Sequence, residues 1–176
     1  MALSDSVYNT LDLLDKETRQ HCARVGSLAR QIELYLKLPD NYLSNAGYVH
    51  DIGKLYISHN ILAKPGKLTK LESNIIHLHS YFGYEILKNL DVDDVICQIV
   101  LYHHGLNVPT LEPVQKCTDD KILERSKMLH TIDEFEALTA NRAFRSRFTK
   151  AQAIAIMKEE PNHSKDVMQF FSSCSV

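Results

Sequence analysis

Apolar side chains recur at intervals of three and four residues along most of the chain, which is the pattern of amphipathic helices. The first such stretch covers residues 11–38 and ends before Pro39, whose ring does not fit in a helix interior. A second covers residues 41–51 and closes at Gly53. We find no convincing run of alternating apolar and polar residues, the pattern of strands. The sequence therefore predicts an all-α fold, a compact bundle of about seven or eight helices.

The helical pattern continues after a predicted loop at residues 53–66, which contains one short helical turn. Thr69 with Glu72, and Thr149 with Gln152, have the spacing of capping boxes that mark helix starts. Further helices are predicted near residues 81–89, 91–102, 120–140, 149–159 and 164–171. Residues 106–119 contain two prolines and show no periodicity. We predict a long binding loop there, with disorder as the alternative.

Length and composition predict one globular domain over residues 1–176. The chain is 44% hydrophobic and 24% charged, with a net charge of −2, which excludes a disordered chain and argues against a partner made of DNA or RNA. We expect neither a membrane span nor a signal peptide, because no apolar run is long enough to span a membrane and the first residues lack the basic-then-apolar pattern of a signal peptide. Four widely spaced cysteines are expected to be reduced thiols. We expect a cytoplasmic protein without a membrane partner; protein partners stay open.

Histidine is the unusual feature of the composition, with nine residues against six glycines. His50 and Asp51 are adjacent at a predicted helix end, so both side chains can reach one ion beyond that end. His103 and His104 form a second adjacent pair, also followed by glycine. Imidazole and carboxylate ligands together suit Fe, Mn, Co, Ni or Zn better than Mg or Ca alone.

Other residues extend this pattern. Glu17 and His21 are four residues apart and share one helical face, and Asp133 lies in an apolar helical segment where a lone carboxylate is costly to bury. Each has a plainer explanation: a surface ion pair for Glu17 and His21, a core hydrogen bond for His79, and exposure to water for Asp133. Taken together, these residues favour a metal site.

Five stretches form a recognisable combination of motifs: VHDIGKL at residues 49–55, ILAKPGKLT at 61–69, HSYFGYEIL at 79–87, HH at 103–104 and DEFEALT at 133–139. With His21, this order resembles the HD superfamily of metal-dependent phosphohydrolases. It is similar in particular to the HD-GYP branch, whose members degrade the bacterial messenger cyclic di-GMP. The resemblance covers roughly residues 17–157, the core of the expected domain.

The resemblance implies a centre of two metal ions. The first ion would be bound by His21, His50, Asp51 and Asp133. The second would be bound by His79, His103, His104 and the shared carboxylate of Asp51. Glu17 matches a position that recruits a third ion in some members. Fe or Mn is the favoured metal, with Zn, Ni or Co as alternatives.

The implied activity is that of a metal-dependent phosphodiesterase, a signalling hydrolase acting on a cyclic dinucleotide such as cyclic di-GMP. Asp51 would hold both ions, and a hydroxide bridging them would attack phosphorus. Lys54, Arg142 and Arg145 match basic residues that take up charge on the phosphate oxygens. The plainer alternatives are that Lys54 is a solvated lysine in a loop and that Arg142 and Arg145 form a solvated basic patch.

The loop after His104 departs from the family's signature. The family continues with an acidic residue, a tryptophan, an Asp-Gly step and Gly-Tyr-Pro, whereas here Leu111-Glu112-Pro113 occupies the last slot. Lys127 also replaces a usual arginine. Two alternatives follow for the function: a phosphohydrolase acting on another nucleotide phosphoester, or a metal-binding signalling module without enzymatic activity.

Overall fold

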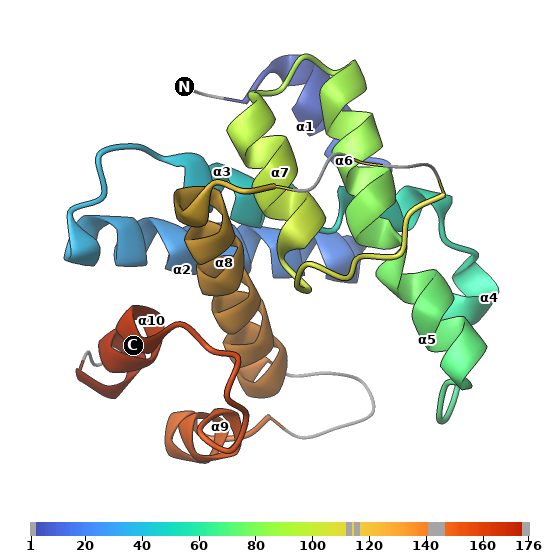
Figure 1. Ribbon diagram of the computed structural model, residues 1–176. Coiled ribbons are helices and arrows are strands. Elements are labelled where there is room, and N and C mark those ends of the chain that lie inside the picture. The colour runs from blue at the N-terminus through green and yellow to red at the C-terminus, as the bar shows by residue number, and fades with distance from the viewer. Residues whose placement is uncertain (1–2, 112–113, 115–116, 141–146, 174–176) are drawn as a thin grey trace.

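The computed structural model describes residues 3–111, 114, 117–140 and 147–173. These residues form ten α-helices and one 3₁₀ helix, and no strand occurs among them. The all-α prediction is therefore confirmed (Figure 1). The elements are α1 (Asp5–Leu11), α2 (Lys16–Leu36), α3 (Tyr42–Val49), η1 (Ile52–Tyr56), α4 (His59–Leu62), α5 (Lys70–His77), α6 (His79–Asn89), α7 (Asp94–Tyr102), α8 (Asp120–Thr139), α9 (Lys150–Met157) and α10 (Lys165–Ser173).

The prediction of one continuous helix over residues 11–38 is wrong at its start. The chain turns between α1 and α2, and Asp15 has an extended backbone with its side chain accepting a hydrogen bond from the Thr18 N–H. Asp15 is therefore the N-cap of α2. Its side chain pairs the Thr18 N–H, which in a continuous helix would donate to the backbone carbonyl four residues earlier. Helix α1, which lies almost entirely before residue 11, and the short α4 account for more helices than the expected seven or eight.

Both predicted capping boxes are confirmed. Thr69 and Glu72 exchange side-chain and backbone hydrogen bonds at the start of α5, and Thr149 and Gln152 do so at the start of α9. The expected loop after Gly53 contains η1 and α4. In the expected binding loop at residues 106–119, the described residues are neither helix nor strand; residues 112, 113, 115 and 116 lie outside the described part.

The helices pack around a core that lies between α2, α3, α7 and α8 (Figure 1). Helices α2 and α3 approach closely because both carry glycine at the contact: a Cβ on Gly47 would lie 2.9 Å from the Cα of Gly26. The C-terminal helix α10 joins through Phe171, which stacks on Phe135 of α8 at a centroid distance of 3.8 Å. No described helix is long and apolar enough to cross a membrane.

A second close approach sets η1 against α6. A Cβ on Gly53 would lie 2.0 Å from the carbonyl oxygen of His79 and 2.4 Å from the amide nitrogen of Gly83. Only glycine allows this separation. The contact fixes the end of α3 and the start of α6 beside each other, and both positions carry predicted metal ligands.

Candidate metal centre

The predicted ligands of the first ion converge from three parts of the chain. His21 comes from α2, His50 and Asp51 follow α3, and Asp133 comes from α8. Nε2 of His21 lies 2.9 Å from Oδ1 of Asp133 and 3.7 Å from Oδ2 of Asp51. Nε2 of His50 lies 3.7 Å and 3.6 Å from the same two oxygens. The arrangement places two imidazole nitrogens and two carboxylates around one point.

His50 provides the sharpest test of whether this group fits a cation. Its Nδ1–H donates to the carbonyl of Gly47 at 2.9 Å, which leaves a lone pair on Nε2. That Nε2 is buried and has no hydrogen-bond partner among the described residues. A buried nitrogen lone pair next to two carboxylates is costly without a positive charge. A metal ion satisfies all of these groups at once.

The predicted ligands of the second ion also lie together. His79 begins α6, and His103 and His104 follow α7; a ligand atom of each lies within 4.8 Å of the others. The Nδ1 atoms of His79 and His103 donate to the carbonyls of Ile76 and Val100, both at 2.6 Å. Their Nε2 lone pairs then face each other at 3.3 Å. Two lone pairs at this distance repel, and a cation that binds both removes the conflict.

Asp51 connects the two clusters. Its Oδ1 lies 3.5 Å from Nε2 of His79, and its Oδ2 faces His50 and accepts a hydrogen bond from Nζ of Lys54 at 2.6 Å. The side chain of Asp51 is only 3% exposed. A single carboxylate with one oxygen toward each cluster is the geometry that a bridging ligand needs.

The titration behaviour of the two clusters differs. Burial raises the pKa of Asp51, but Lys54 and the neighbouring imidazoles outweigh it and hold this pKa far below its usual range. Burial lowers the pKa of His50, yet Asp51 together with the neighbouring Cys22 and Asp133 outweighs it, and the pKa is raised. In the second cluster burial dominates, lowering the pKa of His79 to about 4 and of His103 to about 3. The first cluster thus favours positive charge, and the second keeps neutral imidazoles that are free to bind a metal.

Sequence reasoning missed the residues that orient His21. Nδ1 of His21 donates to Oε2 of Glu136, whose Oε1 accepts a hydrogen bond from Nε of Arg24. Glu136 is one turn after Asp133 on α8, so the spacing of these two carboxylates is a signal that could have pointed to it. Outer carboxylates of this kind fix the tautomer of a ligating histidine.

The other predicted site residues that the structure describes differ in how far they lie from the two clusters. Lys54 lies at the centre, beside Asp51. Glu17 is exposed in the first turn of α2, outside the groups that converge. Arg142 and Arg145 lie outside the described residues. The roles of Glu17, Arg142 and Arg145 therefore stay predictions.

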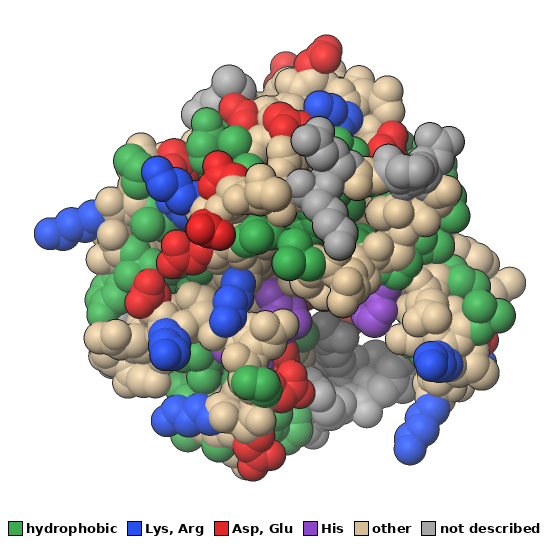
Figure 2. Space-filling view, in the orientation of Figure 1, with side chains coloured by type: hydrophobic (Ala, Val, Ile, Leu, Met, Phe, Trp, Pro, Cys, Tyr) green, Lys and Arg blue, Asp and Glu red, His purple; other side chains and the backbone are tan. Residues whose placement is uncertain are grey.

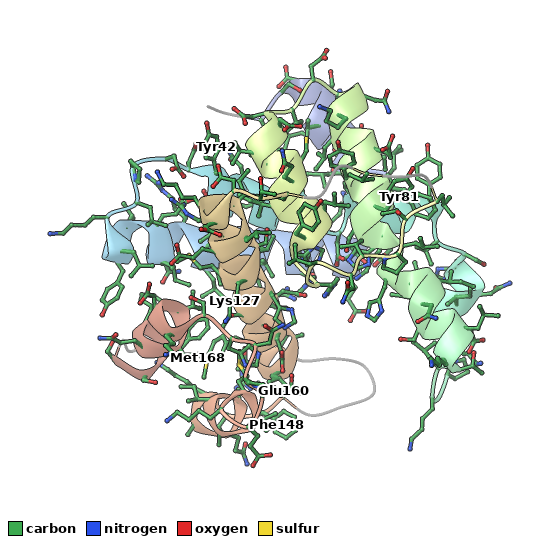
Figure 3. All side chains as sticks on the ribbon, in the orientation of Figure 1. Tyr42, Tyr81, Lys127, Phe148, Glu160 and Met168 are labelled. Carbon is green, nitrogen blue, oxygen red and sulfur yellow. The ribbon has the colours of Figure 1, made fainter. Side chains whose placement is uncertain are left out.

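The centre opens toward the surface. Figure 2 shows histidine side chains in the middle of this face, at the edge of a hollow. Next to His103 lies a cavity of about 260 Å³, and its lining includes Gly105, Lys127 and Asn162. Figure 3 places Lys127 on α8. A ligand bound to the centre could reach this cavity.

The fold and the paired histidine–aspartate clusters define a helical domain built around a candidate metal centre. The family model of the HD domain matches residues 18–138. The chain belongs to the HD domain family.

Two curated relatives are each 32% identical to this chain over the aligned residues. A 3'3'-cGAMP-specific phosphodiesterase of Vibrio cholerae is 32% identical over 152 residues, which are 85% of this chain and 33% of the relative. A cyclic di-GMP phosphodiesterase of Pseudomonas aeruginosa is 32% identical over 157 residues, 85% of this chain and 37% of the relative. The chain thus spans about a third of the length of these relatives.

A solved structure confirms the fold. The HD domain of the phosphodiesterase PgpH from L. monocytogenes, in complex with cyclic-di-AMP, matches with a TM-score of 0.67. The match covers 94% of this chain and 91% of that chain, at 18% identity. At this identity the similarity concerns the arrangement of helices.

Proposed function

We propose that this chain is a metal-dependent phosphodiesterase domain that hydrolyses a cyclic dinucleotide. The observation that carries the proposal is the position of Asp51, whose two carboxylate oxygens face two separate clusters of imidazoles. The relatives named above act on cyclic di-GMP and on 3'3'-cGAMP, which supports a substrate of this class.

The ligands in this proposal are those predicted from the sequence. His21, His50 and Asp133 hold one divalent ion, His79, His103 and His104 hold the second, and Asp51 contacts both. Such a pair supplies Lewis acidity and an activated water at neutral pH. The mixture of imidazole and carboxylate favours Fe or Mn, with Zn, Ni and Co as alternatives, and Glu17 is kept as the candidate for a third ion.

Lys54 has a defined task in this proposal. Burial lowers its pKa, but the adjacent Asp51 carboxylate outweighs burial and the pKa of Lys54 is raised, so the ammonium group stays charged at neutral pH. Its Nζ donates to Asp51, and two further N–H groups can bind a phosphate oxygen at the centre. Lys54 therefore orients the bridging carboxylate and binds the phosphate. Arg142 and Arg145, which follow α8 in sequence, are proposed to contact the phosphate as well.

The loop after His104 is the stretch of sequence least like the family's signature. Leu111-Glu112-Pro113 occupies the Gly-Tyr-Pro slot. This favours a second candidate function, hydrolysis of another nucleotide phosphoester at the same centre. A cytoplasmic location, which the free thiols of Cys22 and Cys97 suit, stays part of the proposal.

The test is hydrolysis by the chain loaded with Mn²⁺ or Fe²⁺. The panel contains cyclic di-GMP, 3'3'-cGAMP, cyclic di-AMP and simple nucleotide phosphoesters, with products separated by chromatography. We expect at least one cyclic dinucleotide to be opened to a linear product. Hydrolysis of only the simple phosphoesters would favour the second candidate. No turnover on any member, with metal confirmed by elemental analysis, would leave a metal-binding module without enzymatic activity.

Two matched variants distinguish loss of the metal centre from a nonspecific effect of substitution on the fold. Asp51→Ala removes the shared ligand, so the two ions of the paired centre are expected to be lost and the hydrolysis to collapse. Asp166→Ala, an exposed carboxylate in the first turn of α10, is expected to behave as wild type. Wild-type metal content in Asp51→Ala would show that the assignment of the bridge is wrong.

A further inference from the structure

His130, Glu134 and His163 form a third cluster of metal-binding side chains. His130 and Glu134 lie one turn apart on α8, and His163 lies in the link between α9 and α10. Each offers a ligand atom, and the three atoms lie within 4.8 Å of one another. Neither the family resemblance nor the proposed phosphodiesterase chemistry uses any of these residues.

His163 has a fixed tautomer. Its Nδ1–H donates to the carbonyl of Met157 at 2.8 Å, so Nε2 of the neutral ring carries a lone pair. That lone pair faces Oε2 of Glu134 at 2.9 Å, and an ionised carboxylate only accepts hydrogen bonds. Two acceptors at this distance need a positive charge between them, which is either a proton or a metal ion.

His130 favours the metal ion over the proton. Its ring lies parallel to that of His163, with an interplanar angle of 7° and centroids 5.6 Å apart. Its Nε2 is 3.7 Å from the same Oε2 of Glu134, while its Nδ1 is buried without a hydrogen-bond partner among the described residues. A proton shared between His163 and Glu134 leaves His130 without a strong partner. A cation can bind a nitrogen of each ring together with the carboxylate.

The position of His163 is also held from the side of α8. The backbone N–H of the next residue, Ser164, donates to Oγ1 of Thr131 at 2.9 Å. His163 is only 6% exposed, whereas the side chains of His130 and Glu134 are 23% and 24% exposed. The cluster is therefore preorganised on one side and reachable by an ion on the other.

We propose that His130, Glu134 and His163 bind one divalent transition-metal ion that joins α8 to the link between α9 and α10. Two imidazoles and one carboxylate suit Zn, Co or Ni and leave a coordination position for water. The site adjoins the paired centre, because the rings of His130 and His104 are 5.9 Å apart. The proposal does not depend on the phosphodiesterase function.

The decisive variant is Glu134→Gln. Glutamine has the size of glutamate, and its amide N–H can donate to Nε2 of His163, so the contact between α8 and the link survives. The neutral amide is a poor metal ligand. After loading with Co²⁺ and desalting, elemental analysis should find one ion fewer per chain than in wild type. His59→Gln, an exposed histidine of α4, is the control and should keep the wild-type content.

A second measurement guards against a folding defect and against failure of the paired centre. In Asp51→Ala, Co²⁺ should still bind with the visible absorption of a histidine-coordinated ion, and adding Glu134→Gln should remove that signal while the helical circular dichroism is retained. Equal metal content in wild type and Glu134→Gln overturns the proposal. So does an Asp51→Ala chain that takes up no Co²⁺, or one whose Co²⁺ signal is unchanged by Glu134→Gln.

Discussion

His21 is held between two carboxylates on α8, with Asp133 at its Nε2 and Glu136 at its Nδ1. Burial raises the pKa of Glu136, but the hydrogen bonds from His21 and Arg24 outweigh it, so this pKa is lowered. An ionised Glu136 keeps the proton of the neutral ring on Nδ1 and leaves the lone pair on Nε2, the atom proposed to bind the metal. We therefore expect Glu136 to act on the proposed centre through His21.

Glu136→Gln is therefore expected to weaken metal binding while leaving every ligand in place. Loss of a carboxylate behind a ligating histidine reduces metal affinity by about 10–100-fold. Titration of the chelator-treated chain with Mn²⁺ measures this affinity. Glu124→Gln, an exposed glutamate on the same helix, is the matched control. Equal affinities in the two variants would mean that Glu136 does not orient His21.

At the scale of elements, the site depends on how closely η1 meets α6. The missing side chain of Gly53 lets the backbone of His79 approach, and this brings Asp51 and His79 within 3.5 Å. An added methyl group has to push these two elements apart. Asp51 would then move away from His79, and its carboxylate would no longer reach both clusters.

Gly53→Ala is expected to lose about 1–3 kcal/mol of unfolding free energy, the usual cost of overpacking. It should also lose much of its metal. Gly83→Ala is the control from the same contact, since its added Cβ comes nearest to the side chain of Val100, at 3.2 Å, and lies at an ordinary contact distance of 3.5 Å from the backbone nitrogen of Gly53. Its unfolding free energy should stay within about 1 kcal/mol of wild type, because alanine also favours the helix. Denaturant unfolding and elemental analysis of both variants check this; an unperturbed Gly53→Ala would contradict it.

Local sequence patterns predicted some elements and missed others for identifiable reasons. The capping boxes at Thr69 and Thr149 were predictable because all their hydrogen bonds form within four residues of sequence. The break before α2 was not, since apolar spacing continues across it and only the side chain of Asp15 marks the new start. The spacing of apolar residues indicates which side of a helix is buried. It does not reveal a short turn when the residues on both sides of the turn bury their apolar side chains in the same core.

At the scale of the whole molecule, sequence patterns predicted the ligands of the paired centre but not the neighbouring cluster of His130, Glu134 and His163. His50-Asp51 and His103-His104 are visible as neighbours in sequence, and the family's motif order linked them to His21 and Asp133. The contact of Glu134 with His163 joins residues far apart in sequence and has no spacing signal. Such a contact follows from how α10 packs on α8, which the sequence pattern alone does not specify.

The proposed paired centre would collect its ligands from α2, the end of α3, the start of α6, the end of α7 and α8. Any ion bound there connects most of the helices of the core, and the unfolded chain cannot hold the same ligands together. Metal binding should therefore stabilise the whole fold and not only the site. A free ion at about 100 times its dissociation constant adds about 2.7 kcal/mol per site.

For a chain of this length, that energy corresponds to a rise in Tm of about 5–10 °C per site. Chelator-treated protein should show this rise when Mn²⁺ is added, and a much smaller one with Mg²⁺, because imidazole nitrogens bind Mg²⁺ poorly. Asp133→Asn weakens the first cluster and should show a smaller rise with Mn²⁺ than wild type. Thermal unfolding followed by circular dichroism measures all three. If Mn²⁺ left the wild-type Tm unchanged, or raised it equally in Asp133→Asn, the ligands from separate helices would not be acting as one centre that holds those helices together.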